Sequence, residues 1–159
     1  MLGTKAEEKI YVKDGSVGKG VFAAKDFSKG EEILQWTGPI LSLDEAVALG
    51  EETGHPVQIG PKAYVDPVPP GRFVNHSCDP NAGVRNLTTL VAITDIKKDT
   101  EIRFDYSTTM DEGLWKMPCL CGSSNCRKTV GDFKDLPSKL KEKYIHLGIV
   151  HEFIMAKYT

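Results

Sequence analysis

The sequence lacks any long apolar run, any signal-peptide core and any excess of positive charge. No stretch approaches the about 20 apolar residues that a membrane-spanning helix needs, and the charged segment 1–9 has no hydrophobic core of a secretory signal. Lys and Arg number 20 against 22 Asp and Glu, so the formal net charge is −2. We therefore expect an intracellular protein, nuclear in a eukaryote or cytoplasmic in a prokaryote, with no membrane association and no direct nucleic-acid binding.

Cysteine is also scarce, with four in 159 residues. In a reducing compartment these are better interpreted as metal ligands than as two disulfides. Cys119, Cys121 and Cys126 fall within eight residues and can converge on one ion, and tetrahedral zinc needs a fourth ligand. Cys78 is the only thiol left, and we favour it for a structural zinc site. The alternative fourth ligands are His55, His76, His146 and His151.

A chain of 159 residues has the length of a single domain. Its short segments rich in Val, Ile and Thr, separated by Gly and Pro, predict a mainly β fold. The capping-box spacing of Ser42 and Glu45 predicts one short helix that ends at Gly50. Apolar residues at helical intervals predict two further helices, in 137–147 and 150–158. The segments 87–96 and 101–106, joined by a turn at 97–100, predict a β-hairpin.

The segment Arg72–Asn81 packs amides, an imidazole, a hydroxyl and a thiol into ten residues that end in a turn. Because its Cys78 needs distant partners, we predict that two remote parts of the chain meet here; the alternative is a polar surface turn with an inert buried thiol. Upstream, Asp14–Gly20 predicts a glycine-rich loop whose Gly18 and Gly20 let a ligand approach the backbone, with an ordinary hairpin as the alternative.

Together, these motifs resemble a SET-domain protein lysine methyltransferase with a zinc-binding post-SET segment, and the resemblance covers Val12 to Gly131 in order. Gly18-Lys19-Gly20 is similar to the family's glycine pair and Arg72–Asn81 to its asparagine-histidine segment. Glu101–Tyr106 is similar to the strand that ends in its active-site tyrosine, and the three late cysteines to its post-SET ligands. The resemblance implies a SET domain at 1–110, a post-SET segment at 111–131 and a helical tail at 132–159, in one compact unit.

The resemblance further implies a fold of small sheets around a pseudoknot and transfer of methyl groups from S-adenosylmethionine to lysine in a protein such as a histone tail. Tyr106 is then the catalytic residue, and Trp36 and Phe104 line the substrate channel. The implied zinc ligands are Cys78, Cys119, Cys121 and Cys126. The implied cofactor-binding residues are Gly18, Lys19, Gly20, Tyr64, Asn75, His76 and Leu120, the last of these placed to cover the adenine.

One departure from the family pattern is Trp36, which stands where a tyrosine is common and cannot offer a phenol to the amine. A second interpretation is therefore a peptide- or chromatin-binding module that kept the fold and lost the activity. A third, a hydrolase site of His76, Ser77 and Cys78, is disfavoured because adjacent residues on an extended segment point apart. In the family that the chain resembles, the position two residues before the active-site tyrosine controls the number of methyl groups added. Here that position is Phe104, which offers no hydroxyl to hold a water in the channel, so the resemblance implies di- or trimethylation.

Overall fold

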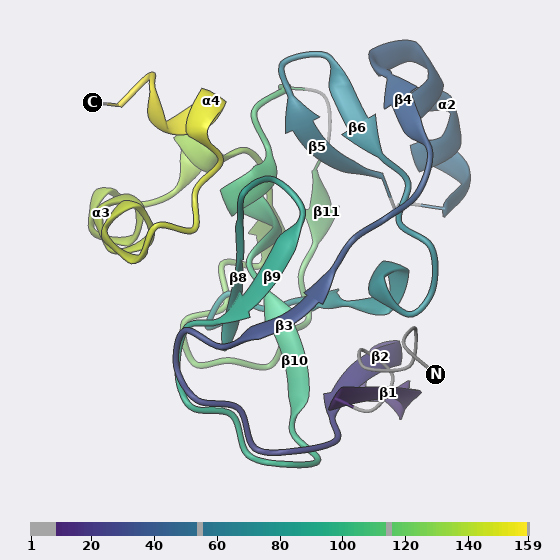
Figure 1. Cartoon of the computed structure of the whole chain (residues 1–159). Coiled ribbons are helices and arrows are strands. Elements are labelled where there is room, and N and C mark those ends of the chain that lie inside the picture. Colours follow the sequence, from purple (N-terminus) through teal and green to yellow (C-terminus); the bar gives the residue numbers. More distant parts are fainter. Residues whose placement is uncertain (1–8, 54–55, 114–115, 159) are drawn as a thin grey trace.

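The structure is a computed structural model that describes residues 9–53, 56–113 and 116–158. The described chain forms four small β-sheets, with α2 at one edge and the C-terminal helices at the opposite side (Figure 1). The strands of the first half are β1 (Ile10–Gly15), β2 (Gly18–Ala23), β3 (Glu32–Gln35), β4 (Ile40–Ser42), β5 (Val57–Gly60) and β6 (Ala63–Val65). Those of the second half are β7 (Asn75–His76), β8 (Ala82–Arg85), β9 (Thr89–Ala92), β10 (Glu101–Phe104), β11 (Met117–Pro118) and β12 (Thr129–Val130).

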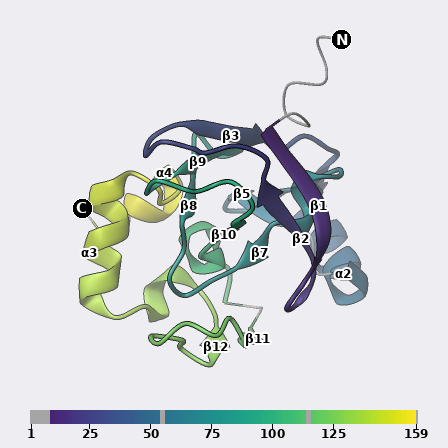
Figure 2. The ribbon, with the colours of Figure 1, turned by 90° about the horizontal axis from the view of Figure 1, so that it is seen from below.

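The helical elements are the α-helices α2 (Leu43–Thr53), α3 (Ser138–Leu147) and α4 (Glu152–Met155) and the 3-10 helices η2 (Gly71–Phe73), η3 (Tyr106–Thr109) and η4 (Phe133–Asp135). The sheets have the strand orders β1-β2-β10-β7, β3-β9-β8, β4-β6-β5 and β11-β12. Seen from below, β10 and β7 lie in the middle of the molecule, with β8 on one side and β2 on the other (Figure 2). The mainly β fold of small sheets is confirmed.

The glycine-rich segment is not an open loop but the end of a hairpin. Gly15 pairs with Gly18 across a two-residue turn, so Gly18, Lys19 and Gly20 all belong to strand β2. Gly18 has φ of 96°, a value that suits a residue without a Cβ. The hairpin alternative is therefore the correct one for this segment.

The predicted hairpin of 87–96 with 101–106 is wrong. Strand β9 pairs with β8 through a three-residue loop in which Asn86 and Leu87 have positive φ, and with β3 on its other edge. Because both edges of β9 are taken, β10 pairs elsewhere, with β2 and β7. A bridge between Phe27 and Ile96 holds the connecting segment on its way to that second sheet.

The helices follow the sequence patterns with two differences. Ser42 and Glu45 form the predicted capping box, since the Ser42 hydroxyl accepts from the Glu45 amide and the Glu45 carboxylate from the Ser42 amide. Helix α2, however, continues through Gly50 to Thr53, so Gly50 does not end it. Helix α3 ends at Gly148, which is left-handed with φ of 72°, as expected of a C-terminal cap. The last helix is a single turn, α4, and does not span 150–158.

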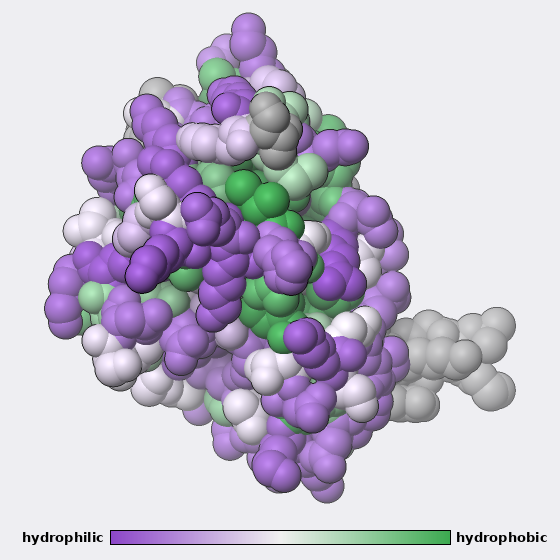
Figure 3. All heavy atoms as spheres, turned by 90° about the vertical axis from the view of Figure 1, so that its left-hand side faces the viewer, coloured by the Kyte–Doolittle hydropathy of each residue, from purple (hydrophilic) through white to green (hydrophobic). Residues whose placement is uncertain are grey.

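The C-terminal tail buries its apolar side against the sheets. Its core cluster contains Ile93 of the body together with Phe133, Leu136, Tyr144, Ile149, Val150 and Ile154. A Cβ on Gly83 of β8 would lie 2.5 Å from the Ile149 side chain, so the tail approaches this strand as closely as a glycine permits. The face that carries the tail is mostly hydrophilic around a hydrophobic strip (Figure 3). Among the described residues, none of the helices is long and apolar enough to cross a membrane.

Candidate active site and metal centre

The parallel pair of β7 and β10 brings the polar segment Arg72–Asn81 to the end of β10. Arg103 lies opposite Asn75 and Phe104 opposite His76, and the Ser77 amide donates to the Phe104 carbonyl over 3.0 Å. The prediction that two remote parts of the chain meet at Arg72–Asn81 is thus confirmed.

Tyr106 lies just beyond the strand and begins the 3-10 helix η3. Strand β10 ends at Phe104, two residues earlier than expected, because Asp105 caps η3 by accepting from the Ser107 amide. The Tyr106 hydroxyl donates to the Val74 carbonyl over 2.8 Å. Burial raises the pKa of Tyr106 above its usual value, so the hydroxyl keeps its proton and its orientation.

An aromatic wall extends from Tyr106. The ring centroids of Phe104 and Tyr106 are 4.9 Å apart, and those of Trp36 and Phe104 are 5.2 Å apart. The indole nitrogen of Trp36 donates to the Gly71 carbonyl over 2.9 Å. A Cβ on Gly71 would lie 2.5 Å from the indole, so this glycine makes room for the ring. The Trp36 N–H is committed to the backbone, and its ring serves as an apolar surface.

A polar network lies on the β2 side of the pairing. The side-chain amide of Asn75 donates to the Lys19 carbonyl and to the Glu101 carboxylate, each over 2.9 Å. A Cβ on Gly20 would lie 2.4 Å from the same carboxylate, so a larger residue here would displace Glu101 from this position. Arg103 donates to the other oxygen of Glu101 over 2.7 Å. The predicted residues of β2 and β7 are brought together, and Glu101 and Arg103 are additions that sequence reasoning missed.

The His76 ring joins the Tyr106 backbone to a cysteine. Its Nδ1 accepts from the Tyr106 amide over 3.0 Å, so in the neutral ring the proton sits on Nε2, 3.3 Å from the Cys78 sulfur. Burial lowers the pKa of His76 to about 4, which keeps the ring neutral at physiological pH. The imidazole therefore positions Tyr106 and Cys78, which leaves only the His76 backbone for the cofactor contact that the resemblance implies.

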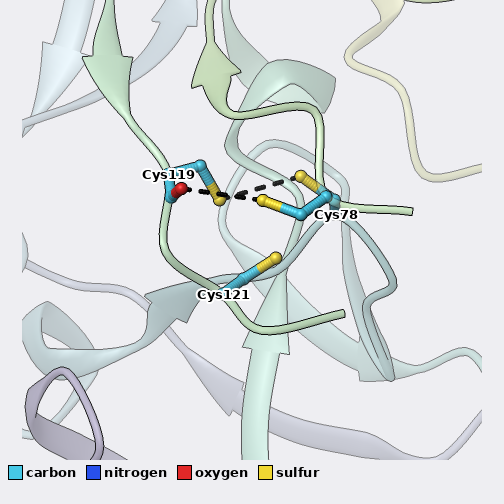
Figure 4. Close-up of side chains that lie close together, drawn as sticks. Cys78, Cys119 and Cys121 are labelled. Carbon is cyan, nitrogen blue, oxygen red and sulfur yellow. Dashed lines mark hydrogen bonds between the residues drawn. The ribbon is translucent and has the colours of Figure 1, made fainter. Parts of the chain in front are cut away.

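The four cysteines gather in one cluster of free thiols. Figure 4 labels three of them, Cys78, Cys119 and Cys121, whose side chains point toward one another. Their sulfur atoms all lie within 4.8 Å of one another, and those of Cys78 and Cys119 are 3.8 Å apart. Tetrahedral zinc with Zn–S bonds of about 2.3 Å places its sulfurs about 3.8 Å apart, so the cluster fits that ion. Among the alternative ligands, His76 bonds to the Tyr106 amide and the Cys78 sulfur, and His151 bonds to the Gln58 carbonyl. His146 is exposed, and His55 lies outside the described residues.

The environment of the cluster sets what its thiols need in order to ionise. Burial raises the pKa of Cys78 and raises that of Cys119 to about 12. Thiolates at these positions need a compensating positive charge, which a divalent metal ion supplies. At Cys121, burial opposes ionisation, but hydrogen bonds, first among them that with the Ser123 hydroxyl, bring the pKa down to about 6.

Two predicted cofactor residues lie apart from the Asn75 network. Leu120 stands between two of the cysteines and is 84 % exposed, an unusual position for a large apolar side chain. Tyr64 belongs to β6, in another sheet from β2 (Figure 1), and its buried hydroxyl bonds to Glu112. The contacts of the described residues therefore give Tyr64 no link to Asn75 or to β2.

The chain thus combines small sheets, a parallel β7–β10 pair and a tyrosine two residues beyond the end of β10. The family model of the SET domain matches residues 18–107, more than half of the chain. The chain belongs to the SET-domain family. Its tail, 132–159, and its cysteine segment lie outside the matched region.

Individual relatives are distant and much longer. Human histone-lysine N-methyltransferase 2D is 28% identical over 144 residues, which cover 80% of this chain and 3% of that protein. Histone-lysine N-methyltransferase ASHH2 of Arabidopsis thaliana is 26% identical over 147 residues, covering 79% and 8%. Among solved structures, a humanized Chaetomium thermophilum Polycomb Repressive Complex 2 with a bound inhibitor shares 27% identity at a TM-score of 0.56, over 63% of this chain and 15% of that one.

Proposed function

We propose that the chain transfers methyl groups from S-adenosylmethionine to the side-chain amine of lysine in a protein substrate. The observation that carries the proposal is the Tyr106 hydroxyl, held 2.8 Å from the Val74 carbonyl at the end of the aromatic wall of Phe104 and Trp36. The relatives named above are histone-lysine methyltransferases, which supports a lysine of a protein, with a histone tail as the first candidate.

The aromatic wall suits the protonation that the reaction needs. A lysine with a pKa of about 10.4 is neutral in only about one molecule in 250 at pH 8, and only the neutral amine can attack. Trp36 and Phe104 are each 3% exposed and offer the channel no charge, so they disfavour the ammonium form. The phenol oxygen of Tyr106 can accept from an amine while its own proton points at Val74, and so fixes the direction of attack.

The polar network on the β2 side fits an elongated cofactor with an amine. Both hydrogens of the Asn75 amide are used by Lys19 and Glu101, which leaves its carbonyl oxygen as the acceptor. S-adenosylmethionine, when bound, supplies the methyl group on a sulfonium. Asn75 and the backbone of Gly18, Lys19, Gly20 and His76 would hold it, and the exposed Leu120 would cover its adenine. A role for Tyr64 in this site has no support from its contacts.

A zinc ion held by the four cysteines would be structural, because the site is closed by protein ligands. It would fix the segment 119–126, and with it Leu120, against the end of β10. With that assignment we propose the division into a SET domain at 1–110, a post-SET segment at 111–131 and a tail at 132–159, packed as one unit. Because the relatives are histone-lysine N-methyltransferases, the chain would act inside the cell, and in the nucleus if the source is a eukaryote.

The second candidate is a binding module that recognises lysine peptides without turnover. It is favoured by Trp36, whose N–H is locked to the Gly71 carbonyl at a position where the family often has a phenol. That nucleic acid is not a partner remains a prediction, because it rests on net charge alone and a solved SET neighbour of 22% identity was determined with DNA.

The test is methylation of a lysine-peptide array with S-adenosylmethionine, read by mass spectrometry and followed by calorimetric titration of cofactor and of the best peptide. We expect mass additions of 14 Da per methyl group in the parent chain and little or none in Tyr106→Phe. Binding of peptide without any mass addition would overturn the enzyme assignment in favour of the binding module.

A further inference from the structure

A buried carboxylate next to the active-site tyrosine joins three parts of the chain. Asp105 is 1% exposed and lies between Phe104, at the end of β10, and Tyr106. Its oxygens accept from the Arg127 guanidinium over 2.7 and 2.8 Å and from the Tyr144 hydroxyl over 2.8 Å. The Ser107 amide donates to it as well, over 3.0 Å. A charged acceptor with this many donors in a buried site is held firmly in one orientation.

Arg127 carries the connection to the cysteine cluster. It directly follows Cys126, and its backbone amide donates to the Cys78 sulfur over 3.3 Å. One residue thus bonds a metal-ligating sulfur through its main chain and Asp105 through its side chain. A shift of the Asp105 carboxylate would therefore move both Tyr106 and the donor beside Cys78.

Tyr144 carries the connection to the tail. It lies in α3, outside the segment that the SET family model matches, and its side chain is fully buried. Burial first, and the negative charge of Asp105 second, raise its pKa, so the hydroxyl acts as a donor. Tyr144 lies in one buried apolar cluster with Phe133, Ile149 and Ile154, so its hydroxyl reaches Asp105 from a packed core.

We propose that Tyr144 is a positioning residue for methyl transfer, which acts through Asp105 on Tyr106 and, through Arg127, on the cysteine cluster. The inference rests on the proposed function. The tail is then part of the catalytic unit, because it supplies one of the three side-chain hydrogen bonds that orient Asp105. Tyr144 touches neither the channel rings nor Asn75 among the contacts described, so its effect should fall on turnover and not on binding.

The experiment compares Tyr144→Phe, which removes one hydroxyl, with Tyr158→Phe in the same tail. Tyr158 is 38% exposed and packs its ring edge-on against Phe133, without a contact to Asp105. Two quantities are measured on the zinc-loaded chain: kcat and KM for the best lysine peptide, and the rate of zinc release to a chromogenic chelator. Arg127→Lys is the second variant, since it keeps the charge but cannot bond both oxygens of Asp105.

For Tyr144→Phe we expect kcat to fall about 10-fold, KM to stay within about twofold and zinc release to accelerate about 10-fold, the scale of losing an outer hydrogen bond at a metal site. Arg127→Lys should likewise lower kcat and accelerate zinc release. The double variant should lose less than the sum of the two effects, because both act through Asp105. Tyr158→Phe should match the parent.

Unchanged kcat and zinc release in a folded Tyr144→Phe, or equal losses in Tyr158→Phe, would overturn the inference. If Tyr144→Phe does not fold, Arg127→Lys decides by the same two rates. A parent chain that releases zinc slowly but methylates nothing would contradict the proposed function, and the effect of Tyr144→Phe on zinc release would still decide whether the tail is coupled to the cluster.

Discussion

The two sides of Tyr106 carry different kinds of side chain, aromatic on one side and polar on the other. On one side, where we propose the substrate channel, lie the carbon surfaces of Phe104 and Trp36, packed ring against ring. On the cluster side lie His76, Cys78 and Asp105, each buried and each held by hydrogen bonds. The channel side can exclude water from an amine, whereas the cluster side can fix the position of the tyrosine. Changes on the two sides should therefore separate chemistry from assembly.

The largest effect on turnover is expected from a change at Tyr106, which lies between the two sides. Tyr106→Phe removes the hydroxyl that Val74 orients and should lower kcat by two to four orders of magnitude, about the scale of losing a positioned catalytic group. Cofactor affinity and zinc content should stay near the parent values, because the ring keeps its packing. Calorimetry, elemental analysis and turnover measured on one preparation check the three quantities. More than half of the parent rate would make Tyr106 a packing residue only.

The next largest effect is expected from a substitution that disrupts only the cysteine cluster. Cys78→Ser removes the ligand that joins the central segment to the segment 119–126, and we expect loss of the one zinc per chain, a lower melting temperature and weaker cofactor binding. Elemental analysis and thermal unfolding with and without a chelator provide the measurement. A parent without zinc, or a variant with unchanged metal content, would contradict the assignment of the four cysteines.

These two changes also mark what the sequence could predict. The spacing of Cys119, Cys121 and Cys126 is a local pattern, so the sequence could predict a metal cluster, whereas the role of Tyr106 was implied only by the family resemblance. The partners of Asp105 could not, because Arg127 and Tyr144 are 22 and 39 residues away and no periodicity relates them. The same limit explains the wrong hairpin: alternation marks strands but does not say which strand pairs with which, and β9 was already paired on both edges. A glycine-rich stretch, likewise, fits both a loop and a hairpin end.

A smaller effect tests how the tail is held, by pH. His151, just before α4, donates from Nε2 to the Gln58 carbonyl over 2.7 Å, and burial lowers its pKa to about 4. The folded state therefore binds this proton less readily than the unfolded state, whose pKa is about 6.5. The contribution is complete above pH 6.5 and is lost as pH falls towards 4, which amounts to about 2 kcal/mol between pH 6.5 and 5.

Urea unfolding at pH 7 and pH 5 measures this dependence. His151→Gln, which cannot ionise, should lose less stability over that interval than the parent does. The matched control is His146→Gln, which changes an exposed histidine of the same tail and should keep the parent's pH dependence. Equal slopes for parent and His151→Gln would show that the tail is not held through a neutral His151.

The smallest effect sharpens the channel side, at Phe104. The rings of Phe104 and Tyr106 pack against one another with their centroids 4.9 Å apart, although β10 ends at Phe104. Phenylalanine has no hydroxyl to hold a water there, so a methylated amine can take the water's place, and we expect di- or trimethylated product from the parent.

In Phe104→Tyr the added hydroxyl should hold that water and shift the product towards monomethylation, with the first transfer largely preserved. Mass spectra of the peptide over time check this, and a parent that stops at one methyl group under excess cofactor would contradict it. In that case Trp36, which packs 5.2 Å from Phe104 and is fixed by Gly71, would be the group that fills the space for the second methyl.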